Sequence, residues 1–476
     1  MEFDKDLAAR QEARVLCRQA EEAQRKLAAM SQGQLDAIVM AVAKAFESAA
    51  EELAEMAAAE TGFGNREDKT VKNRFASCAV EKRIRDMKVV GVLKEDDKEK
   101  IWEIGVPVGV IAAIVPSTNP TSTVCYKALI ALKSGNTIVF SPHPKAAKCT
   151  LKAARIVAEA AKSAGAPEGA VSCLGHGSMA GCQELMGAKE VRLILATGGP
   201  AMVRSAYSSG KPAIGVGAGN GPAYIHHTAD IRKALERIRK SKTFDYGTVC
   251  ASEQSIIVEK ALEQEVVRTA GEMGYYFMKS EEAERLAGIL FRENGAMNPE
   301  AVGKPAKKLA ELAGFRVPEG TKILVGREEE AGPTHPYSSE KLCPVLAFYV
   351  MDSEEKVLEK VVEVLRHEGA GHTFAIHCED QKVIRKFAMA VPVSRLLVNT
   401  PAALGGIGAT TGLFPALTLG CGAVGGSASS NNIGPMDLVN IRRVAWGTNS
   451  ENEAVKVKVD AELVELLAAK ILERLK

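Results

Sequence analysis

The first sixty residues repeat apolar positions at helical spacing. Residues 5–60 are rich in Ala, Glu, Gln and Leu, so intrinsic propensity and pattern both favour helices. One apolar face is formed by Leu35, Ile38, Val39, Val42 and Phe46.

From residue 106 the pattern changes to short, wholly apolar runs separated by helical stretches. A first series of runs covers residues 108–115, 136–140, 191–197 and 222–226. A second series covers residues 255–259, 346–350, 373–377 and 395–399. Runs of this length without polar alternation indicate parallel strands covered by helices on both faces. The chain is therefore predicted to be an α/β protein with a second α/β domain beginning near residue 220.

Three segments depart from this pattern. Residues 88–107 alternate around an acidic turn, which predicts a β-hairpin whose weak core pattern indicates an arm packed on another subunit. A Gly/Ser-rich passage at 420–435 leads into a strand-like segment at 438–446. After a polar linker, residues 460–476 are predicted to be helical, with an apolar stripe made by Leu463, Val464, Leu467, Ile471 and Leu475.

Composition narrows the class of protein. The chain has 476 residues, 46% apolar and 25% charged, typical of a globular protein of two domains. A formal net charge of +2 provides no basic field for a nucleic acid, and the longest apolar runs are too short to span a bilayer. The first ten residues lack the apolar core of a signal peptide. The ten cysteines include no C-x-x-C and no zinc-like pairing with histidine, so we expect reduced thiols in the cytoplasm and no metal site.

Cys250 is the candidate nucleophile. It lies in TFDYGTVCASEQ (243–254), between a Gly-containing loop and a predicted strand, where its thiolate fraction would be strongly nucleophilic. Most other cysteines are expected to be small buried apolar residues: Cys17, Cys78, Cys125, Cys149, Cys173, Cys182, Cys378 and Cys421.

Two loops near predicted strand ends carry further candidate chemistry. In PSTNPTS (116–122), Asn119 either donates its side-chain N–H to a developing oxyanion, worth roughly 3–4 kcal/mol, or caps a turn. In ATGGPAMVRSA (196–206), a Gly-Gly pair opens a helix whose free N–H groups attract phosphate. GVGAGN (215–220) precedes a strand rather than a helix, so we do not count it as a dinucleotide fingerprint.

Taken together, these segments resemble the aldehyde dehydrogenase superfamily, and within it the CoA-acylating branch, which includes acetaldehyde dehydrogenases and the aldehyde-oxidising half of bifunctional aldehyde–alcohol dehydrogenases. The matching stretches keep one order over about residues 5–445: PSTNPTST, IVFSPHPKA, LILATGGPAMV, SSGKPAIGVGAGN, SKTFDYGTVCASEQ, EKLCPVL, GHT and LTLGCGAVGG. The resemblance implies a Rossmann-type dinucleotide-binding domain at 1–87 and 108–219 and a catalytic domain at 220–425. Oligomerisation elements are expected at 88–107 and 426–447, and a linker with an amphipathic helix at 448–476.

The resemblance also implies roles for individual residues. Cys250 would attack the aldehyde, and Asn119 and the backbone N–H of Cys250 would hold the oxyanion. His372 would assist proton transfer or thiol attack, although a hydrogen-bonded core histidine fits the same position. His367 and His377 are expected to be structural. The dinucleotide would be held by Ser141, Pro142, His143, Thr197, Gly198, Gly199, Gly217 and Glu340, the last of these at the nicotinamide ribose.

One departure from the superfamily bears on the reaction. Hydrolytic members carry a water-activating glutamate where this chain has Gly215, and glycine cannot act as a general base. The resemblance therefore implies reversible oxidation of a short-chain aldehyde, acetaldehyde or propionaldehyde, with NAD and coenzyme A to acyl-CoA and NADH. Alternatives are sulfoacetaldehyde as substrate, a hydrolytic or phosphorylating enzyme, and an inactive shell-associated scaffold. NADP stays open because Ser141 replaces a common lysine and no acidic residue clearly guards the ribose.

The expected partners are small molecules and further copies of the chain, as a homodimer or homotetramer. The C-terminal helix resembles the encapsulation peptides that dock enzymes inside bacterial microcompartments, or it caps the protein's own core or dimer. The expected location is the cytoplasm, including the lumen of such a compartment.

Overall fold

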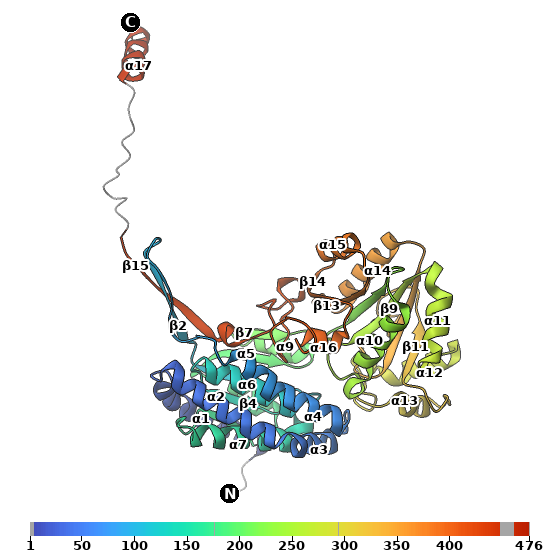
Figure 1. Cartoon of the computed structure of the whole chain (residues 1–476). Coiled ribbons are helices and arrows are strands. Elements are labelled where there is room, and N and C mark those ends of the chain that lie inside the picture. The colour runs from blue at the N-terminus through green and yellow to red at the C-terminus, as the bar shows by residue number, and fades with distance from the viewer. Residues whose placement is uncertain (1–3, 176, 294, 448–460, 476) are drawn as a thin grey trace.

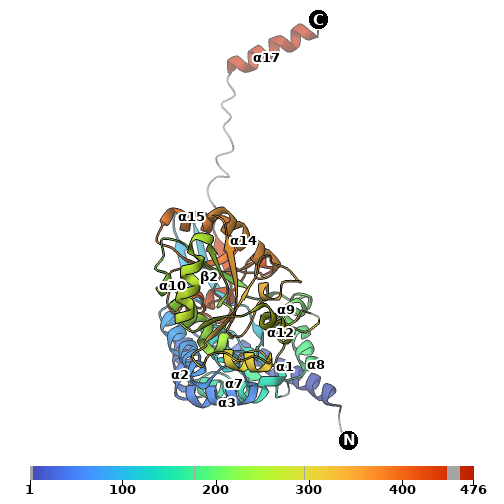
Figure 2. The same ribbon diagram turned by 90° about the vertical axis from the view of Figure 1, so that its right-hand side faces the viewer.

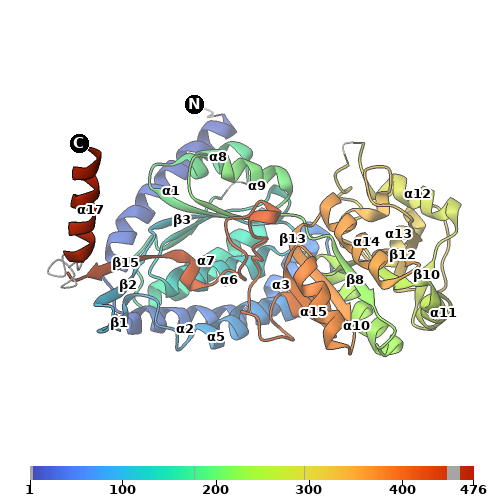
Figure 3. The ribbon, with the colours of Figure 1, turned by 90° about the horizontal axis from the view of Figure 1, so that it is seen from above.

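Two α/β domains lie side by side, and a three-stranded sheet projects from the first (Figures 1 and 3). The structure is a computed structural model that describes residues 4–175, 177–293, 295–447 and 461–475. Within these ranges, no helix has both the length and the apolar character to cross a membrane.

The predicted N-terminal helices are present, and their ends follow capping chemistry. Asp4 accepts a hydrogen bond from the backbone N–H of Asp6, and Ser31 with Gln34 forms a capping box. A π-helical turn, η1 (Phe75–Ala79), joins the last two helices of this group. The helices are α1 (Lys5–Leu27), α2 (Gln32–Ser48), α3 (Ala50–Thr61), α4 (Arg66–Arg74) and α5 (Val80–Ile84).

The first domain contains a five-stranded parallel sheet in the order β5-β4-β3-β6-β7. Alternate residues of β3 face opposite layers: Ile111 packs in the core with α2, α6 and α7, whereas Ala112 packs with α1 and α8. Helices on both faces therefore explain why the strands are apolar throughout. The elements are β3 (Val110–Ile114), α6 (Pro120–Lys133), β4 (Ile138–Ser141), α7 (Ala147–Ser163), β5 (Val171–Cys173), α8 (Met179–Gly187), β6 (Val191–Thr197), α9 (Pro200–Tyr207) and β7 (Ala213–Val216).

The second domain contains a seven-stranded parallel sheet in the order β10-β11-β12-β9-β8-β13-β14. Its first strand begins at Gly221, close to the predicted start of this domain. The strands are β8 (Gly221–Ile225), β9 (Glu253–Glu259), β10 (Tyr275–Phe277), β11 (Ile323–Arg327), β12 (Val345–Met351), β13 (Gly371–His377) and β14 (Val393–Val398). The helices are α10 (Ile231–Thr243), α11 (Glu263–Glu272), α12 (Ser280–Leu290), α13 (Ala306–Leu312), α14 (Glu354–His367), α15 (Gln381–Ala390) and α16 (Ala402–Gly406).

The predicted hairpin is present as β1 (Gly91–Asp96) and β2 (Ile101–Pro107), and β15 (Val439–Ala445) adds a third antiparallel strand. Within the expected oligomerisation element at 426–447, β15 joins the arm sheet, whereas Ile433 and Leu438 are buried in the core of the first domain.

The prediction of buried cysteines is wrong for Cys78, which is exposed, and Cys173 is half-buried. Cys78 lies in the π-helical turn η1, where the neighbouring Ala76 and Ser77 take the buried positions. Cys173 is the last residue of the three-residue strand β5. The other six cysteines of that group are buried, as expected.

The C-terminal helix α17 (Ala461–Arg474) lies apart from the other elements in all three views of the ribbon (Figures 1, 2 and 3). The predicted linker at 448–460 and the side chain of Leu463 lie outside the described residues. Residues 464–475 are all exposed, including Val464, Leu467, Ile471 and Leu475 of the predicted stripe.

Candidate active site

A cavity of about 330 Å³ lies between the two domains. The first domain contributes the loops that follow the carboxyl ends of β3, β6 and β7, the edge at which parallel sheets bind ligands. The second domain contributes the turn before β9 and the loop before β12. The following predicted site residues line the cavity: Asn119, His143, Thr197, Gly198, Gly199, Gly217, Cys250 and Glu340.

Three predicted site residues do not line this cavity. Ser141 and Pro142 are buried at the end of β4, directly before His143. His372 is fully buried in β13, where its Nδ1 lies 2.9 Å from Thr373 Oγ1. Burial, with the nearby charge of Arg395, lowers the pKa of His372 to about 3. The imidazole is therefore neutral, and its expected part in proton transfer stays a prediction.

Cys250 lies in a tight turn that packs closely against the backbone at Gly219. A Cβ atom at Gly219 would lie 2.0 Å from the Cys250 carbonyl oxygen, so only glycine fits there. Burial raises the pKa of the Cys250 thiol to about 12, with the Glu340 and Cys421 side chains adding to the shift and Arg395 opposing it. The resting thiol is therefore protonated at neutral pH.

Asn119 directly precedes α6, but its side chain does not cap that helix. Its Oδ1 accepts a hydrogen bond from the ammonium group of Lys72. Its Nδ2 donates to Thr118 Oγ1 at 3.1 Å and faces the carbonyl oxygen of Thr248, two residues before Cys250, at 3.4 Å. The side chain therefore makes no capping bond to α6, and its amide N–H group points toward the Cys250 turn.

The orientation of Asn119 depends on a buried charge cluster. Lys72 also donates to Asp245 Oδ2, and Lys69 donates to the same carboxylate at 2.9 Å. Burial lowers the pKa of Lys72 to about 8, although the Asp245 carboxylate opposes that shift. Burial works against ionisation of Asp245, but the two ammonium groups outweigh it and lower the pKa of that carboxyl group. Two cations and one anion thus sit behind the amide.

The backbone at this cluster adopts an unusual conformation. Asp245 and Tyr246 have φ values of 47° and 50°, in the left-handed region that costs non-glycine residues about 1–3 kcal/mol each. The side chain of Asp245 reaches so close to Gly64 that a Cβ there would lie 1.8 Å from Asp245 Oδ1. The strained turn therefore places the carboxylate between Lys69 and Lys72.

Glu340 faces the cavity opposite these groups. Its Oε1 accepts a hydrogen bond from the Gly219 N–H at 3.0 Å, and its own N–H donates to Glu368 Oε2 at 2.6 Å. Burial, with the neighbouring Glu368 carboxylate, raises the pKa of Glu340 to about 8. Its carboxyl group is therefore mostly protonated at neutral pH and can both donate and accept hydrogen bonds.

The start of α9 has the form of a phosphate cradle. Gly199 caps this helix without a side chain, and a Cβ placed there would meet no atom within 4 Å. Gly198 and Gly199 both line the cavity. Backbone N–H groups at a helix start and an open approach suit the pyrophosphate of a dinucleotide, so the residues present fit that group.

Sequence reasoning did not single out Lys69, Lys72 or Asp245. Lysines on a short polar helix are expected at the surface, and nothing in their spacing indicates that they point at a buried carboxylate more than 170 residues away. Asp245 was part of the quoted TFDYG stretch but was given no role.

Comparisons with known proteins place the chain in a family. Residues 5–410 match the model of the aldehyde dehydrogenase family. The bifunctional aldehyde-alcohol dehydrogenase AdhE of Escherichia coli K12 is 44% identical over 439 residues, which is 91% of this chain and 49% of that protein. The chain thus spans about half the length of this curated relative.

Solved structures agree. An acetylating aldehyde dehydrogenase from Geobacillus thermoglucosidasius has a TM-score of 0.92 at 49% identity, covering 94% of this chain and 99% of that one. A propionaldehyde dehydrogenase from the fucose utilisation microcompartment of Clostridium phytofermentans has a TM-score of 0.82 at 29% identity, covering 90% and 96%. With the predicted fold confirmed and the family model matching most of the sequence, the chain belongs to the aldehyde dehydrogenase family.

Proposed function

We propose that this protein oxidises a short-chain aldehyde with NAD and coenzyme A, giving acyl-CoA and NADH by reversible chemistry at Cys250. Acetaldehyde and propionaldehyde are the expected substrates. The names of the relatives support this assignment, since they include an acetylating aldehyde dehydrogenase and a propionaldehyde dehydrogenase.

The observation that carries the proposal is a nucleophile and an amide donor in one cavity whose described lining holds no carboxylate that is mostly ionised at neutral pH. The described residues lining the cavity include one carboxyl group, Glu340, which is mostly protonated at neutral pH. Gly215 stands where hydrolytic relatives carry their glutamate. A Cβ there would lie 2.5 Å from Val203 Cγ1 and 2.9 Å from the Tyr207 ring, so this packing leaves no space for that side chain.

The chain's own residues account for the covalent steps. The Cys250 thiol gives its proton to solvent, and its sulfur forms a bond to the aldehyde carbon. The electron pair of the carbonyl π bond moves to the oxygen, which gains the negative charge. Asn119 Nδ2 and the Cys250 N–H donate to that oxygen. After oxidation a thioester remains on Cys250, and the thiolate of coenzyme A displaces the Cys250 sulfur to form acyl-CoA.

A dinucleotide in this cavity would be held by the α9 start at Thr197, Gly198 and Gly199 and by Glu340, with His143 near its adenosine end. When bound, it supplies the hydride acceptor. NAD is proposed over NADP. Lys145, which is exposed and also lines the cavity, is the described lysine nearest to His143 in sequence and the group to test for 2′-phosphate recognition.

The test compares acceptors. Purified protein is given aldehyde and NAD with or without coenzyme A, and NADH, acyl-CoA and free acid are measured. We expect steady turnover only with coenzyme A and no more than one equivalent of NADH without it. Steady release of free acid without coenzyme A would support the hydrolytic alternative, and phosphate dependence would support the phosphorylating one. A panel of C2–C4 aldehydes with sulfoacetaldehyde identifies the substrate.

We also propose that α17 docks the enzyme to the shell of a bacterial microcompartment. Apolar side chains at Val464, Leu467, Ile471 and Leu475 share one face and are all at least 48% exposed. A helix with such a stripe is stable when a partner covers it. The microcompartment origin of one similar structure supports this choice of partner.

Deletion of residues 448–476 tests the docking proposal. We expect unchanged NADH formation and thermal stability, together with loss of co-sedimentation with shell proteins. The matched control replaces exposed charged residues of the same helix, Glu465 and Lys470, by alanine. Loss of folding on deletion would instead mean that the helix caps the protein's own core or dimer.

The arm sheet β1-β2-β15 is proposed to join copies of the chain. Most of its residues are exposed or half-buried, and Trp102 packs edge-on against Trp446, which is 46% exposed, at a ring-centroid distance of 4.9 Å. Large apolar side chains on a projecting sheet indicate a protein interface. A homodimer or homotetramer is expected.

A further inference from the structure

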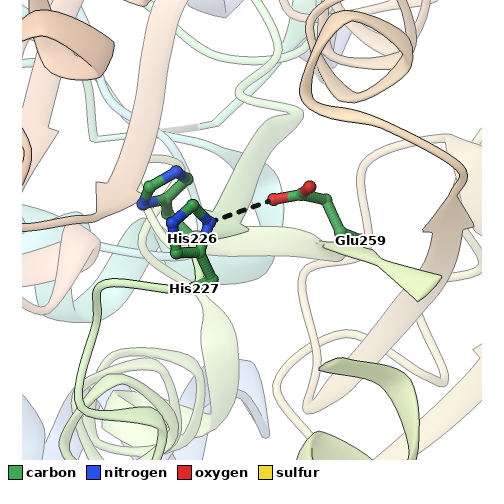
Figure 4. A group of neighbouring side chains, drawn as sticks. All are labelled: His226, His227 and Glu259. Carbon is green, nitrogen blue, oxygen red and sulfur yellow. Dashed lines mark ion pairs between the residues drawn. The ribbon is translucent and has the colours of Figure 1, made fainter. Parts of the chain in front are cut away.

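A second cluster of chemically active side chains lies at the opposite end of the catalytic sheet. His226 and His227 directly follow β8, and Glu259 is the last residue of the neighbouring parallel strand β9. Each offers a ligand atom, and the three atoms lie within 4.8 Å of one another. Figure 4 shows the imidazole of His227 directed at the Glu259 carboxylate, with the ring of His226 beside it.

His226 is oriented as a metal ligand would be. The residue is 1% exposed, and its Nε2 has no hydrogen-bond partner among the described residues. Its Nδ1 lies 2.8 Å from Thr228 Oγ1 and accepts a hydrogen bond from the Thr228 backbone N–H at 3.3 Å, so the ring proton lies on Nε2. A cation bound at Nε2 would move that proton to Nδ1, where it faces Thr228 Oγ1. A buried, unpaired nitrogen is costly unless something binds it.

The separations between the ligand atoms suit a small divalent cation. His227 Nδ1 lies 3.7 Å from Glu259 Oε1, and His226 Nε2 lies 3.5 Å from Glu354 Oε2, at the start of α14. Ligands at about 2.0–2.1 Å in a tetrahedral zinc site are separated by about 3.3–3.4 Å. The cluster is therefore close to the required dimensions before any cation draws the groups together.

Neighbouring groups orient the two carboxylates. Tyr224 donates its hydroxyl proton to Glu259 Oε1 at 2.9 Å, and Lys386 donates to Glu354 Oε1 at 2.6 Å. The lysine engages Oε1 of Glu354 and leaves Oε2 toward His226. Such outer contacts are typical of built metal sites.

We propose that His226, His227 and Glu259 form a binding site for a zinc-type divalent cation, and that Glu354, 3.5 Å from His226, moves in as the fourth ligand. Two imidazoles with carboxylates suit Zn²⁺ and its transition-metal neighbours, whereas Ca²⁺ and Mg²⁺ prefer all-oxygen sites. A search for cysteine–histidine spacing could not find the cluster, because its members are gathered from two strand ends and a helix.

The position of the cluster indicates a structural effect rather than a catalytic one. β9 runs from the Cys250 turn at one end to Glu259 at the other, about 20 Å at 3.3 Å per residue. A cation here would tie β8, β9 and α14 together. It is expected to stabilise the folded domain and to leave the chemistry at Cys250 unchanged.

The test uses tag-free protein carrying Cys250→Ser, which removes the catalytic thiol as a competing zinc ligand. Zn²⁺ binding is measured by titration calorimetry and by metal analysis after dialysis. In a separate sample, Co²⁺ is added and its visible absorption spectrum is recorded to determine the coordination geometry. We expect one equivalent of Zn²⁺, an upward shift in melting temperature, and a tetrahedral Co²⁺ absorption band. His227→Ala should weaken Zn²⁺ binding at least tenfold and abolish the shift. Its side chain is 63% exposed, so the variant should fold.

The matched control is His335→Ala, which removes a histidine paired with Glu328 at 2.9 Å elsewhere in the same domain. Glu259→Gln is the second test variant, because it keeps the shape of the side chain and removes its charge. Binding that is equal in His227→Ala, Glu259→Gln and His335→Ala would overturn the proposal, as would a stoichiometry near zero in the Cys250→Ser parent. The NADH-forming activity of His227→Ala is measured separately in enzyme that keeps Cys250, to show whether the active site is affected.

Discussion

Replacement of Lys72 by methionine tests whether the buried charge cluster positions Asn119 as the proposed oxyanion donor. The ammonium group of Lys72 bonds both Asn119 Oδ1 and Asp245 Oδ2, whereas methionine keeps the length of the side chain and removes the donor. Without that bond the Asn119 amide is free to rotate. Its Nδ2 then no longer points reliably toward the Cys250 turn.

The expected loss follows from the value of an oxyanion donor. Removing such a donor outright costs about 10²–10³-fold in kcat. Lys72 orients the donor without replacing it, so we expect about a ten- to hundredfold fall in kcat/KM, or about 1.4–2.7 kcal/mol. Lys69 still pairs with Asp245 at 2.9 Å in the variant, so the loss of folding stability should stay below the roughly 3–5 kcal/mol that breaking a buried ion pair costs.

The assay is a double-mutant cycle of Lys72→Met and Asn119→Ala, in which NADH formation is measured for each enzyme at saturating coenzyme A. If Lys72 acts through Asn119, the double variant should be no slower than Asn119→Ala alone. Lys69→Met is the control, because Lys69 bonds Asp245 and the Thr118 carbonyl oxygen but not the Asn119 side chain. The reasoning is refuted if the two single losses multiply in the double variant, or if Lys69→Met costs as much activity as Lys72→Met.

Three further substitutions have defined outcomes. Burial raises the pKa of Glu253 to about 7, so the folded protein keeps a proton that the unfolded chain loses near pH 4.5, and folding stability is lost as pH rises through 7. In urea denaturation between pH 5 and 8, the free energy of unfolding of Glu253→Gln should rise relative to that of the parent by up to about 3 kcal/mol. Gly215→Glu should lower the melting temperature through its clash with Tyr207 and give no free acid; acid production in a stable variant would contradict this. Trp102→Arg should reduce the molar mass measured by light scattering while far-UV circular dichroism stays unchanged, and an unaltered mass would count against an arm interface.

The sequence was sufficient for the sheets where strands are long and apolar. The runs at 108–115, 191–197 and 373–377 correspond to β3, β6 and β13 because both faces of each strand are buried, so every position must be apolar. Four shorter strands were missed: β5 and β10 have three residues each, β7 has four and β11 has five, which is too few for a clear periodic pattern.

The cavity residues were predictable to the extent that they follow strand ends. Asn119 lies in the loop between β3 and α6, and Thr197 is the last residue of β6 in the same parallel sheet, so topology brings them to the same edge. Lys72 and Asp245 were not predictable in this way, because their contact depends on how two domains meet and on a left-handed turn at Asp245. No periodicity encodes a contact of that kind.

Burial at this site leaves the resting cavity with little negative charge. Cys250 and Glu340 have raised pKa values and are mostly neutral at pH 7, while Lys69 and Lys72 outnumber Asp245 behind Asn119. Dinucleotide and coenzyme A both carry pyrophosphate, so a cavity without anions favours binding of each. The same burial keeps the nucleophile protonated, and the positive cluster offsets this by stabilising charge on the carbonyl oxygen as the sulfur attacks. A carboxylate that acts as general base for water would add an anion to this cavity, so these electrostatics favour the proposed transfer of the acyl group to a thiol.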